Sequence, residues 1–284
     1  IILMSFELSG KEISKGIKAE LKGLIEDSGV APVLAAVIFG DDEGSVMYAK
    51  SKARTASKLG IEVEIIHHPE ISKTDSALSK IEDIASDAHF HGIILEEPLP
   101  KGIDPYPIRE AIPPEKDVDC TTVVNLGKII SGEPQFYPAT PKAVVEILNH
   151  YDIPVEGSHV VVVGRSRTVG LPLANMLLRK GKSGNATVTV CHSRTPNLAD
   201  FTRRADILVV AMGNPEFIGR NHVSENTVVI DVGTNYVGDK LLGDVDYADL
   251  EGYVKAITPV PGGVGPVTVA ELLRNVYNSS IRLR

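Results

Sequence analysis

The apolar positions of the chain switch repeatedly between helix-like and strand-like spacing. Apolar residues recur every three or four positions over 12–27, whereas Val33–Gly40 is almost continuously apolar, as in a strand buried on both faces. The same patterns predict further helices at 45–59, 75–88 and 108–111, and strands at 61–67 and 92–95. Strands that alternate with helices are typical of an α/β, doubly wound, mostly parallel sheet.

A proline-rich stretch from 97 to 114 interrupts this alternation and is predicted to be a loop. Pro141 then begins a helix that extends to residue 149, with Thr140 as its expected N-cap. Further strands are predicted at 160–163, 187–191, 207–211 and 228–231, and helices at 168–179, 197–204, 223–225 and 268–276. We therefore expect two α/β lobes that meet within 120–150, a ligand cleft between them, and a final helix that returns to the first lobe.

Charge and cysteine content narrow the class of protein. The formal net charge of the 284 residues is -8, which argues against general binding to nucleic acid or to an anionic membrane. No apolar stretch approaches the roughly 18 residues of a membrane span. Cys120 and Cys191 form neither a disulfide framework nor a CxxC metal pattern, so we expect a reducing, cytoplasmic compartment. We interpret Met4 as the start of the natural chain and leave Ile1–Leu3 out of the fold argument.

A glycine-rich turn between a strand and a helix is the best candidate for phosphate binding. The strand at 160–163 leads into Gly164-Arg165-Ser166-Arg167-Thr168-Val169-Gly170 and then into an apolar helix. Gly164 allows a tight turn with close backbone approach, and Gly170 allows the helix to pack against the sheet. The unpaired N–H groups at the helix N-terminus suit a pyrophosphate. The alternative is an ordinary glycine-containing loop.

The end of the following strand indicates which dinucleotide would bind. Sites for NAD usually place an acidic residue there to hold the ribose 2′-hydroxyl. This strand instead ends in Cys191-His192-Ser193-Arg194-Thr195. Ser193 and Arg194, together with Arg165, would suit a 2′-phosphate, so NADP is favoured over NAD. The alternative is that both arginines are solvated surface charges.

Two later segments are also candidates. Gly233 and Thr234 follow a predicted strand, and Pro259–Pro266 contains three glycines bracketed by prolines immediately before a helix. The amides of that loop either face a ligand or form a rigid hinge. Asp244 and Asp246 have the spacing of metal ligands, but two carboxylates make no site, and we interpret them as structural. The sequence therefore predicts no metal centre.

Taken together, these segments resemble the methylenetetrahydrofolate dehydrogenase/cyclohydrolase family, and they occur in the family's order over nearly the whole chain. The matching strings are Tyr48–Lys52, Pro98–Pro100, Lys116–Asp119, Gly164–Ser166 with Val169–Gly170, Cys191–Ser193, Asp231–Gly233, Gly243–Asp246 and Pro261–Pro266 followed by Thr268. The resemblance implies a folate domain at 4–138 plus a C-terminal helix at 266–284, a Rossmann-type NADP domain at 139–265, and a homodimer. It implies hydride transfer from 5,10-methylenetetrahydrofolate to NADP⁺, and hydrolysis of the methenyl product to 10-formyltetrahydrofolate.

The resemblance also implies roles for individual residues. Lys52 would be the catalytic group of the cyclohydrolase, with Tyr48 one helical turn away on the same face and Asp119 holding the pterin ring. The catalytic candidates are Lys52, Tyr48, Glu96 and Asp119. The folate-binding candidates add Ala49, Lys50, Ser51, Leu95, Glu97, Pro261, Gly262, Gly263, Val264 and Gly265. The NADP-binding candidates are Gly164, Arg165, Ser166, Val169, Gly170, Ser193, Arg194, Gly233, Thr234 and Thr268. Without the family, Tyr48 and Lys52 would be read as a solvent-facing pair and Asp119 as a cap.

The chain departs from the family pattern at three positions. Glu96 stands where the family usually has glutamine, and an ionised carboxylate beside Lys52 would favour its ammonium form. Glu96 would then itself serve as the base, and the alternative function is a dehydrogenase with a weakened or altered cyclohydrolase. Cys120 replaces a glycine and is expected to be a small buried side chain rather than a nucleophile. Ala139 replaces a cysteine without a consequence that we can name. Two other hypotheses are a non-catalytic nucleotide-binding regulator and another two-lobed dehydrogenase, acting on a hydroxy or amino acid.

Overall fold

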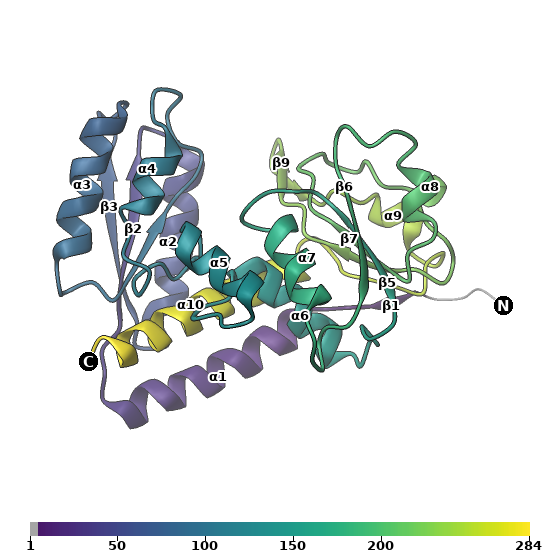
Figure 1. Cartoon of the computed structure of the whole chain (residues 1–284), viewed down its shortest axis with the longest axis horizontal. Coiled ribbons are helices and arrows are strands. Elements are labelled where there is room, and N and C mark those ends of the chain that lie inside the picture. The colour runs from purple at the N-terminus through teal and green to yellow at the C-terminus, as the bar shows by residue number, and fades with distance from the viewer. Residues whose placement is uncertain (1–4) are drawn as a thin grey trace. The chain divides into compact units, whose positions relative to one another are not determined.

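The structure, a computed structural model, describes residues 5–284 (Figure 1), so the interpretation of Met4 lies outside the described residues. The chain divides into two compact units. The first unit comprises Ile17–Ala139 and Val269–Arg284, and the second comprises residues 5–16 and Thr140–Thr268. The division between Ala139 and Thr140 falls within the range 120–150 where the sequence placed the border. Residues 5–16, however, belong to the second unit rather than to the folate domain that the sequence suggested.

The first unit is built on a three-stranded parallel sheet in the order β3–β2–β4. Its strands are β2 (Val33–Phe39), β3 (Glu62–His68) and β4 (Gly92–Leu95). Side chains of β2 alternate between two cores: Leu34, Ala36 and Ile38 pack in one, and Val33, Ala35, Val37 and Phe39 in the other. Because both faces of this central strand are covered, its sequence has no polar alternation.

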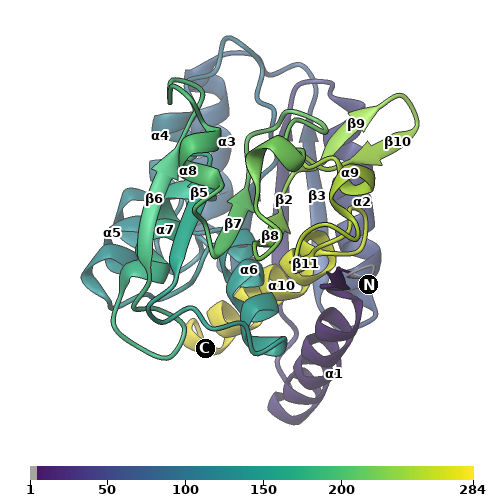
Figure 2. The same cartoon turned by 90° about the vertical axis from the view of Figure 1, so that its right-hand side faces the viewer.

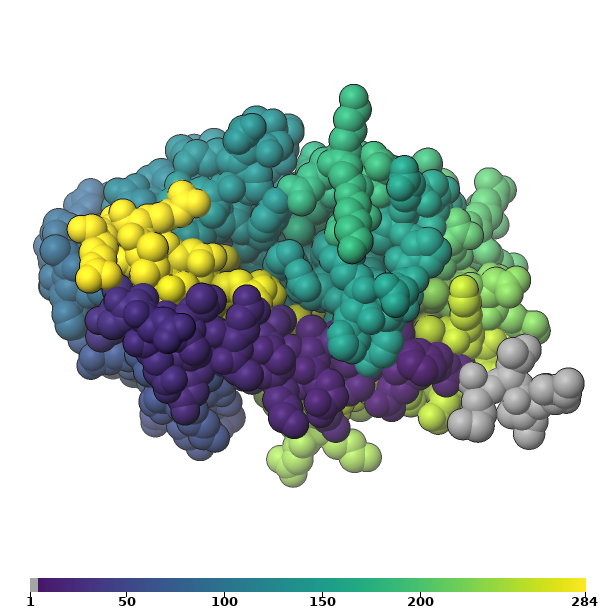
Figure 3. Space-filling view, turned by 90° about the horizontal axis from the view of Figure 1, so that it is seen from below, coloured from purple at the N-terminus to yellow at the C-terminus, as the bar shows by residue number. Residues whose placement is uncertain are grey.

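Helices cover both faces of this sheet. The first core includes residues of α1 (Lys11–Ser28), α2 (Glu43–Ser57) and α10 (Val264–Arg282), and the second includes residues of α3 (Thr74–Ser86) and α4 (Pro105–Glu110). Figure 3 shows α10 alongside α1, where Arg274 forms an ion pair of 2.8 Å with Glu20. Asn275 of α10 also donates to the carbonyl oxygens of Val118 (2.9 Å) and Tyr137 (2.8 Å). The predicted return of the final helix to the first lobe is therefore confirmed.

The second unit contains a six-stranded sheet in the order β1–β11–β8–β7–β5–β6, with every pairing parallel (Figure 2). Its strands are β1 (Phe6–Glu7), β5 (His159–Val163), β6 (Thr187–Cys191), β7 (Ile207–Val210), β8 (Val228–Asp231) and β11 (Ala256–Ile257). β1 joins this sheet by pairing with β11, which explains why residues 5–16 belong here. The strand order reverses at β5, between β6 and β7, and such switch points are where open α/β sheets bind ligands.

Shorter elements complete the second unit. Its helices are α6 (Ala139–His150, beginning at the border), α7 (Gly170–Leu178), α8 (Ala199–Thr202) and α9 (Tyr247–Leu250), with a 3₁₀ turn at Arg220–His222. Strands β9 (Asn235–Val237) and β10 (Lys240–Leu242) form an antiparallel hairpin. Among residues 5–284, no helix combines the length and apolar character that crossing a bilayer requires.

Several local predictions were wrong. Thr140 lies inside α6, which begins at Ala139, because Pro141 is tolerated anywhere in a first helical turn. Residues 223–225 are not helical, and the neighbouring turn covers 220–222 instead. The last helix begins at Val264 rather than at 268, since Pro266 also lies in a first turn that needs no N–H partner. Helix α5 (Val123–Ser131) was missed, although Thr122 caps its start and Gly132, at φ 84°, ends it.

Candidate active site

Helix α2 places Lys52 inside the first unit. Asp42 begins the helix by accepting the N–H of Ser45 at 2.7 Å, and Tyr48 and Lys52 follow one turn apart. The Lys52 ammonium nitrogen lies 4.5 Å from the centre of the Tyr48 ring. Lys52 is only 6% exposed, whereas Tyr48 is 48% exposed. The solvent-facing reading of this pair is therefore wrong for the lysine.

Glu96 is the partner of the buried lysine. It directly follows β4, and its N–H donates to the carbonyl oxygen of Val37 at 2.9 Å, which fixes it at the carboxyl end of the sheet. The Lys52 nitrogen lies 2.5 Å from Glu96 Oε1, and both side chains are 7% exposed. Within residues 5–284 that oxygen receives no aligned hydrogen bond, so the contact is a charge pair rather than a directed hydrogen bond. A buried pair of this kind is stable only while both charges remain.

The carboxylate of Asp119 accepts no hydrogen bond from residues 5–284. The preceding segment runs beside β4, where the N–H of Ile93 donates to the carbonyl oxygen of Lys116 at 2.8 Å. Asp119 is partly exposed, and no hydrogen bond from the described residues reaches its carboxylate. Burial raises its pKa to about 7, while the positive charge of Lys52 acts in the opposite direction. This carboxylate is thus available to accept hydrogen bonds from a ligand.

Asp117, two residues earlier, has the opposite character. It is fully buried and accepts hydrogen bonds from Thr121 N (2.9 Å), Thr122 N (2.9 Å), Thr122 Oγ1 (2.7 Å) and Asn125 Nδ2 (2.9 Å). These bonds organise the turn that leads into α5. Asp117 was not among the candidate site residues, although the hydroxyl residues before a helix were a usable signal.

Cys120 occupies the tight position of that turn. Its φ is 59°, in the left-handed region that favours glycine, which accounts for the glycine expected there. The side chain is buried, with Sγ 3.6 Å from the carbonyl oxygen of Phe136. Burial raises the pKa of the thiol far above its usual range, so little thiolate forms near neutral pH. The prediction of a small buried side chain is confirmed, and that it is not a nucleophile stays a prediction.

The remaining folate candidates are distributed over both units. In the first unit, Ala49 is buried, Lys50 and Ser51 are exposed on α2, Leu95 is half-buried at the end of β4, and Glu97 forms an ion pair with Arg109. The structure thus brings Tyr48, Lys52, Glu96 and Asp119 together at the carboxyl end of one sheet. The candidates Pro261–Gly265 lie in the second unit, and their contact with folate stays a prediction.

The loop at 261–265 has a fixed shape. Gly262 is buried at φ 111°, and its carbonyl oxygen accepts the N–H of Gly10 at 2.8 Å. A Cβ at Gly10 would overlap the carbonyl oxygen of Gly263, so the N-terminal segment packs closely against this loop. The hydroxyl of Thr268 donates to the carbonyl oxygen of Val264 at 3.2 Å, within α10. These contacts are those of a shaped loop rather than of a flexible linker.

In the second unit, the glycine-rich turn after β5 has the geometry that its sequence suggested. A Cβ at Gly164 would overlap the carbonyl oxygen of Ala211, and one at Gly170 would overlap that of Gly164. Ser166 Oγ accepts the N–H of Val169 at 3.1 Å and holds the turn closed. Arg165 and Ser166 are exposed. This loop therefore places the exposed Arg165 and Ser166 at the switch point of the sheet.

The tip of β6 fits a phosphorylated ribose. Ser193 and Arg194 are both exposed, and no acidic residue lies within 192–195. The tip is rigid because the N–H of His192 donates to Thr195 Oγ1 at 2.9 Å and the N–H of Arg194 donates to His192 Nδ1 at 3.2 Å. A hydroxyl and a guanidinium without a competing carboxylate suit a 2′-phosphate better than a free hydroxyl.

The acidic residues after β8 have structural partners. Asp231 is buried and accepts the N–H of Gly233 at 2.9 Å, and burial raises its pKa to about 7 although three backbone N–H donors act in the opposite direction. Asp244 accepts several backbone N–H groups, and Asp246 caps α9. The structural interpretation of Asp244 and Asp246 is confirmed. Thr234 is exposed beside them. Over the described part of the chain, no three His, Cys, Asp or Glu side chains gather as metal ligands would.

Comparison with known proteins agrees with this geometry in both units. Residues 8–119 match the family model described as tetrahydrofolate dehydrogenase/cyclohydrolase, catalytic domain, and residues 138–283 match the NAD(P)-binding domain of the same enzymes. The chain belongs to the tetrahydrofolate dehydrogenase/cyclohydrolase family.

Full-length relatives of this family resemble the chain from end to end. A protein named bifunctional protein FolD, from Caldanaerobacter subterraneus subsp. tengcongensis, is 44% identical over 96% of this chain and 95% of its own length. The bifunctional enzyme of Thermoplasma acidophilum has a crystal structure with a TM-score of 0.89 and 43% identity, covering 97% of this chain and 98% of that one. The Trypanosoma brucei enzyme, solved with NADP cofactor and an inhibitor, has a TM-score of 0.91 at 34% identity, with 98% of both chains covered.

Family membership decides between the hypotheses raised by the sequence. It sets aside the non-catalytic regulator and the hydroxy- or amino-acid dehydrogenase. The Rossmann-type assignment of the second unit and NADP as its cofactor are both supported. The catalytic-domain match also covers α2, β4 and the segment to Asp119, which together carry the buried lysine and its carboxylates.

Proposed function

We propose that this enzyme oxidises 5,10-methylenetetrahydrofolate with NADP⁺ and then hydrolyses the 5,10-methenyl product to 10-formyltetrahydrofolate. The observation that carries the proposal is Lys52, a buried lysine paired with Glu96 at 2.5 Å and flanked by Tyr48 and Asp119. These four residues lie in the part of the chain that matches the catalytic-domain model. Burying a charged pair is costly, and enzymes retain such pairs where the chemistry needs them.

Asp119 and Tyr48 would bind the pterin. The Asp119 carboxylate has no partner among the described residues, so it accepts the amino and amide N–H groups of the ring without first losing another bond. Two such donors in one plane match the two oxygens of a carboxylate. The half-exposed Tyr48 ring offers a flat apolar surface beside Lys52 for the same ring system.

The hydrolytic step needs a base and a proton donor at the methenyl carbon. Water adds its oxygen to that carbon and gives up one proton, and the departing nitrogen takes up a proton as one carbon–nitrogen bond breaks. The second proton of the water leaves to solvent as the formyl oxygen forms, so hydrolysis of the cation releases one proton. We assign uptake of the first proton to the Glu96 carboxylate and protonation of the nitrogen to the Lys52 ammonium, because the two groups are in contact and buried together. The negative charge of Glu96 also stabilises the cationic methenyl group before water adds.

The residues after β5 and β6 would hold the dinucleotide. NADP⁺, when bound, supplies the acceptor for the hydride. The exposed residues Arg165 and Ser166 lie in the loop just before α7, a position suited to the pyrophosphate. Ser193 and Arg194 would bind the 2′-phosphate, and the contact of Gly233, Thr234 and Thr268 with the cofactor stays a prediction.

The proposal is tested by assaying both reactions on the purified chain. We expect oxidation of methylenetetrahydrofolate with a strong preference for NADP⁺ over NAD⁺, and hydrolysis of the methenyl compound without nucleotide. Lys52→Met should lower the hydrolysis rate by about 10²- to 10⁴-fold. Lys58→Met, which removes an exposed lysine near the end of the same helix, serves as the matched control. Wild-type protein that hydrolyses no methenyl compound, or a Lys52→Met variant as fast as wild type, would contradict the proposal.

We further propose that the enzyme works as a cytoplasmic homodimer. Both cysteines are unpaired and buried, which suits a reducing compartment. The β9–β10 hairpin exposes Tyr236 (76%) and Val237 (50%), apolar side chains of the kind that a second copy would cover. Sedimentation of the wild type should show a dimer, and Tyr236→Ser should weaken it if the hairpin contributes.

A further inference from the structure

Asp244 is buried and accepts hydrogen bonds from three consecutive residues of one loop. It is 0% exposed. Its oxygens accept the backbone N–H groups of Met212 (2.7 Å), Gly213 (2.9 Å) and Asn214 (2.9 Å), and the side-chain amide of Asn235 (2.8 Å). Three consecutive backbone N–H groups that point at one carboxylate form a nest. The carboxylate of Asp244 thereby fixes the backbone conformation of the loop.

This loop lies at the edge of the sheet where a dinucleotide would bind. Residues 212–214 follow β7 almost directly, and β7 is the neighbour of β5 at the switch point. The intervening Ala211 donates its N–H to the carbonyl oxygen of Val163 at 2.8 Å, and its own carbonyl oxygen leaves no room for a side chain at Gly164. Ala211, directly before residues 212–214, is therefore in backbone contact with the start of the glycine-rich loop.

The carboxylate is itself held from two sides. The N–H of Asp244 donates to Asp231 Oδ1 at 3.0 Å, and its carbonyl oxygen accepts the N–H of Ile218 at 3.0 Å. Gly233 and Gly243 have no room for a Cβ. A Cβ at Gly233 would overlap the carboxylate of Asp244, and a Cβ at Gly243 would overlap the carboxylate of Asp231. Asp244 is thus fixed in position, whereas Gly213 and Asn214 are exposed.

We propose that Asp244 is a positioning residue for the dinucleotide: it holds the loop 212–214 in the one backbone conformation that accepts the cofactor beside the glycine-rich loop. The proposal rests on the proposed function, since it assigns the second unit's ligand as NADP. It predicts that replacing Asp244 weakens the binding of the nucleotide and slows hydride transfer. The hydrolysis, which residues of the first unit perform, should not change.

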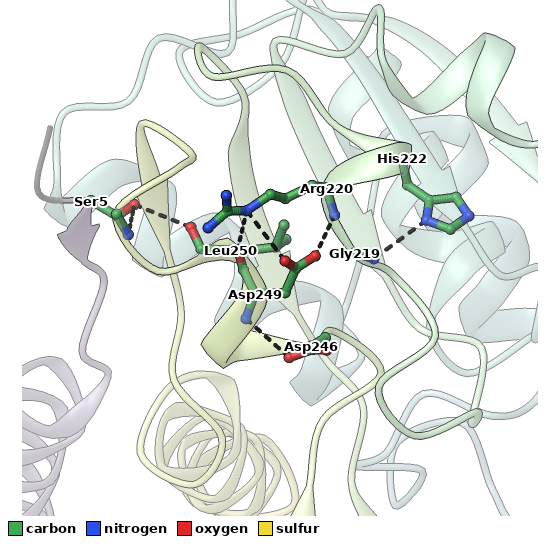
Figure 4. A network of polar contacts seen from close by, with 8 residues as sticks. Ser5, Gly219, Arg220, His222, Asp246, Asp249 and Leu250 are labelled. Atoms are coloured by element: carbon green, nitrogen blue, oxygen red, sulfur yellow. Dashed lines mark hydrogen bonds and ion pairs between the residues drawn. The ribbon is translucent and has the colours of Figure 1, made fainter. Parts of the chain in front are cut away.

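Asp246 provides a matched control from the same four-residue motif. Its carboxylate accepts the N–H of Asp249 at 3.0 Å at the start of α9, and Asp249 in turn accepts the N–H of Arg220 at 2.7 Å. Figure 4 shows this second network, in which Asp246 contacts α9. Asparagine caps helices as well as aspartate does, so Asp246→Asn should behave as wild type.

The test compares Asp244→Asn, Asn235→Ala and Asp246→Asn in the full chain. Asparagine at 244 would turn an NH₂ group toward backbone N–H donors, whereas Asn235→Ala removes one donor only. For each variant we would measure NADPH affinity by fluorescence titration, KM for NADP⁺ and for the folate, nucleotide-free hydrolysis of the methenyl compound, and thermal unfolding. Asp244→Asn should weaken NADPH binding by about tenfold or more, and Asn235→Ala should do so to a smaller extent.

The same measurements define what would overturn the proposal. Hydrolysis and the KM for the folate should stay within about twofold of wild type in all three variants, as expected when a site is left intact. Wild-type NADPH affinity in Asp244→Asn contradicts the proposal, as does an equal loss of nucleotide binding and hydrolysis. If Asp244→Asn does not fold, the Asn235→Ala variant provides the test instead. An NADPH affinity of Asn235→Ala equal to that of wild type then overturns the positioning role. Wild-type protein that binds NADPH but lacks both activities would instead count against the proposed function.

Discussion

Carboxylates in the two units differ in how many hydrogen bonds they accept from the rest of the chain. In the second unit, Asp244 accepts four N–H groups and is fully buried. In the first unit, Asp119 accepts none from the described residues, and Glu96 Oε1 has only the unaligned ammonium of Lys52. A carboxylate that accepts several hydrogen bonds from the chain fixes the backbone around it. A carboxylate that accepts few remains able to bind a ligand. The difference separates structural acids from those that bind or react.

Asp117 and Asp119 test this difference within one turn. Asp117→Ala removes the buried carboxylate that accepts hydrogen bonds from Thr121, Thr122 and Asn125, so the free energy of unfolding should fall by roughly 3 kcal/mol or more. Asp119→Ala should change the free energy of unfolding by less than about 1 kcal/mol, since no hydrogen bond is lost. Urea denaturation of both variants measures the two free energies of unfolding. Equal losses of stability would contradict the distinction between Asp117 as a structural acid and Asp119 as a ligand-binding one.

Asp119→Asn should act on substrate instead. Replacing one acceptor oxygen by a donor should raise the KM for the folate by about tenfold, with little change in the KM for NADP⁺. Steady-state kinetics with each substrate varied separately measures the two effects. A rise in both KM values would indicate that the substitution disturbs more than the pterin site.

The ionisation of Asp119 predicts a pH dependence. Its pKa is raised to about 7, so the carboxylate is largely protonated below that pH and accepts hydrogen bonds poorly. The KM for the folate should therefore fall as pH rises through about 7, and Asp119→Asn should lose this trend. Because the folded pKa is above the unfolded value, the folded chain binds the extra proton between about pH 4 and 7. Stability relative to Asp119→Asn should consequently decrease as pH rises through that window.

Glu96→Gln tests whether Glu96 is the base that accepts the proton of water in the hydrolysis. The amide keeps the shape of the side chain but cannot take a proton, so the pH profile of the hydrolysis should change while the dehydrogenase keeps its own. Comparing both activities across pH for wild type and variant measures this. Superimposable hydrolysis profiles would show that Glu96 is not the group that accepts the proton.

Cys120→Gly should have the smallest effect. Glycine relieves the left-handed backbone of about 1 kcal/mol of strain but loses the packing of a buried thiol, so the change in stability should stay within about 1 kcal/mol. Thermal unfolding measures it. A loss of either activity would show that the thiol does more than fill space.

Much of the first unit could be predicted from local pattern alone. The continuous apolar run of β2 and the spacing of Tyr48 and Lys52 on α2 are short-range signals that the structure retains. The burial of Lys52 could not be predicted in this way, because it depends on Glu96, which is 44 positions further along the chain.

Other features were missed for the same reason. The pairing of β1 with β11 joins residues 250 positions apart and involves only two residues in each strand, too few for a period to be visible. The hydrogen bonds of Asp117 and Asp244 depend on loop geometry rather than on residue type. The sequence indicated that Asp244 is structural, but it could not show which N–H groups each of these two carboxylates accepts.

The connectivity of the chain has a consequence for how the protein can be divided. The first unit is assembled from two distant pieces, Ile17–Ala139 and Val269–Arg284, and its core includes Leu272, Leu273 and Val276 from the second piece. A fragment that stops at residue 139 would expose that apolar surface and should aggregate rather than fold. Neither unit can therefore be produced as one uninterrupted segment of this chain, because each is built from two separate stretches of sequence.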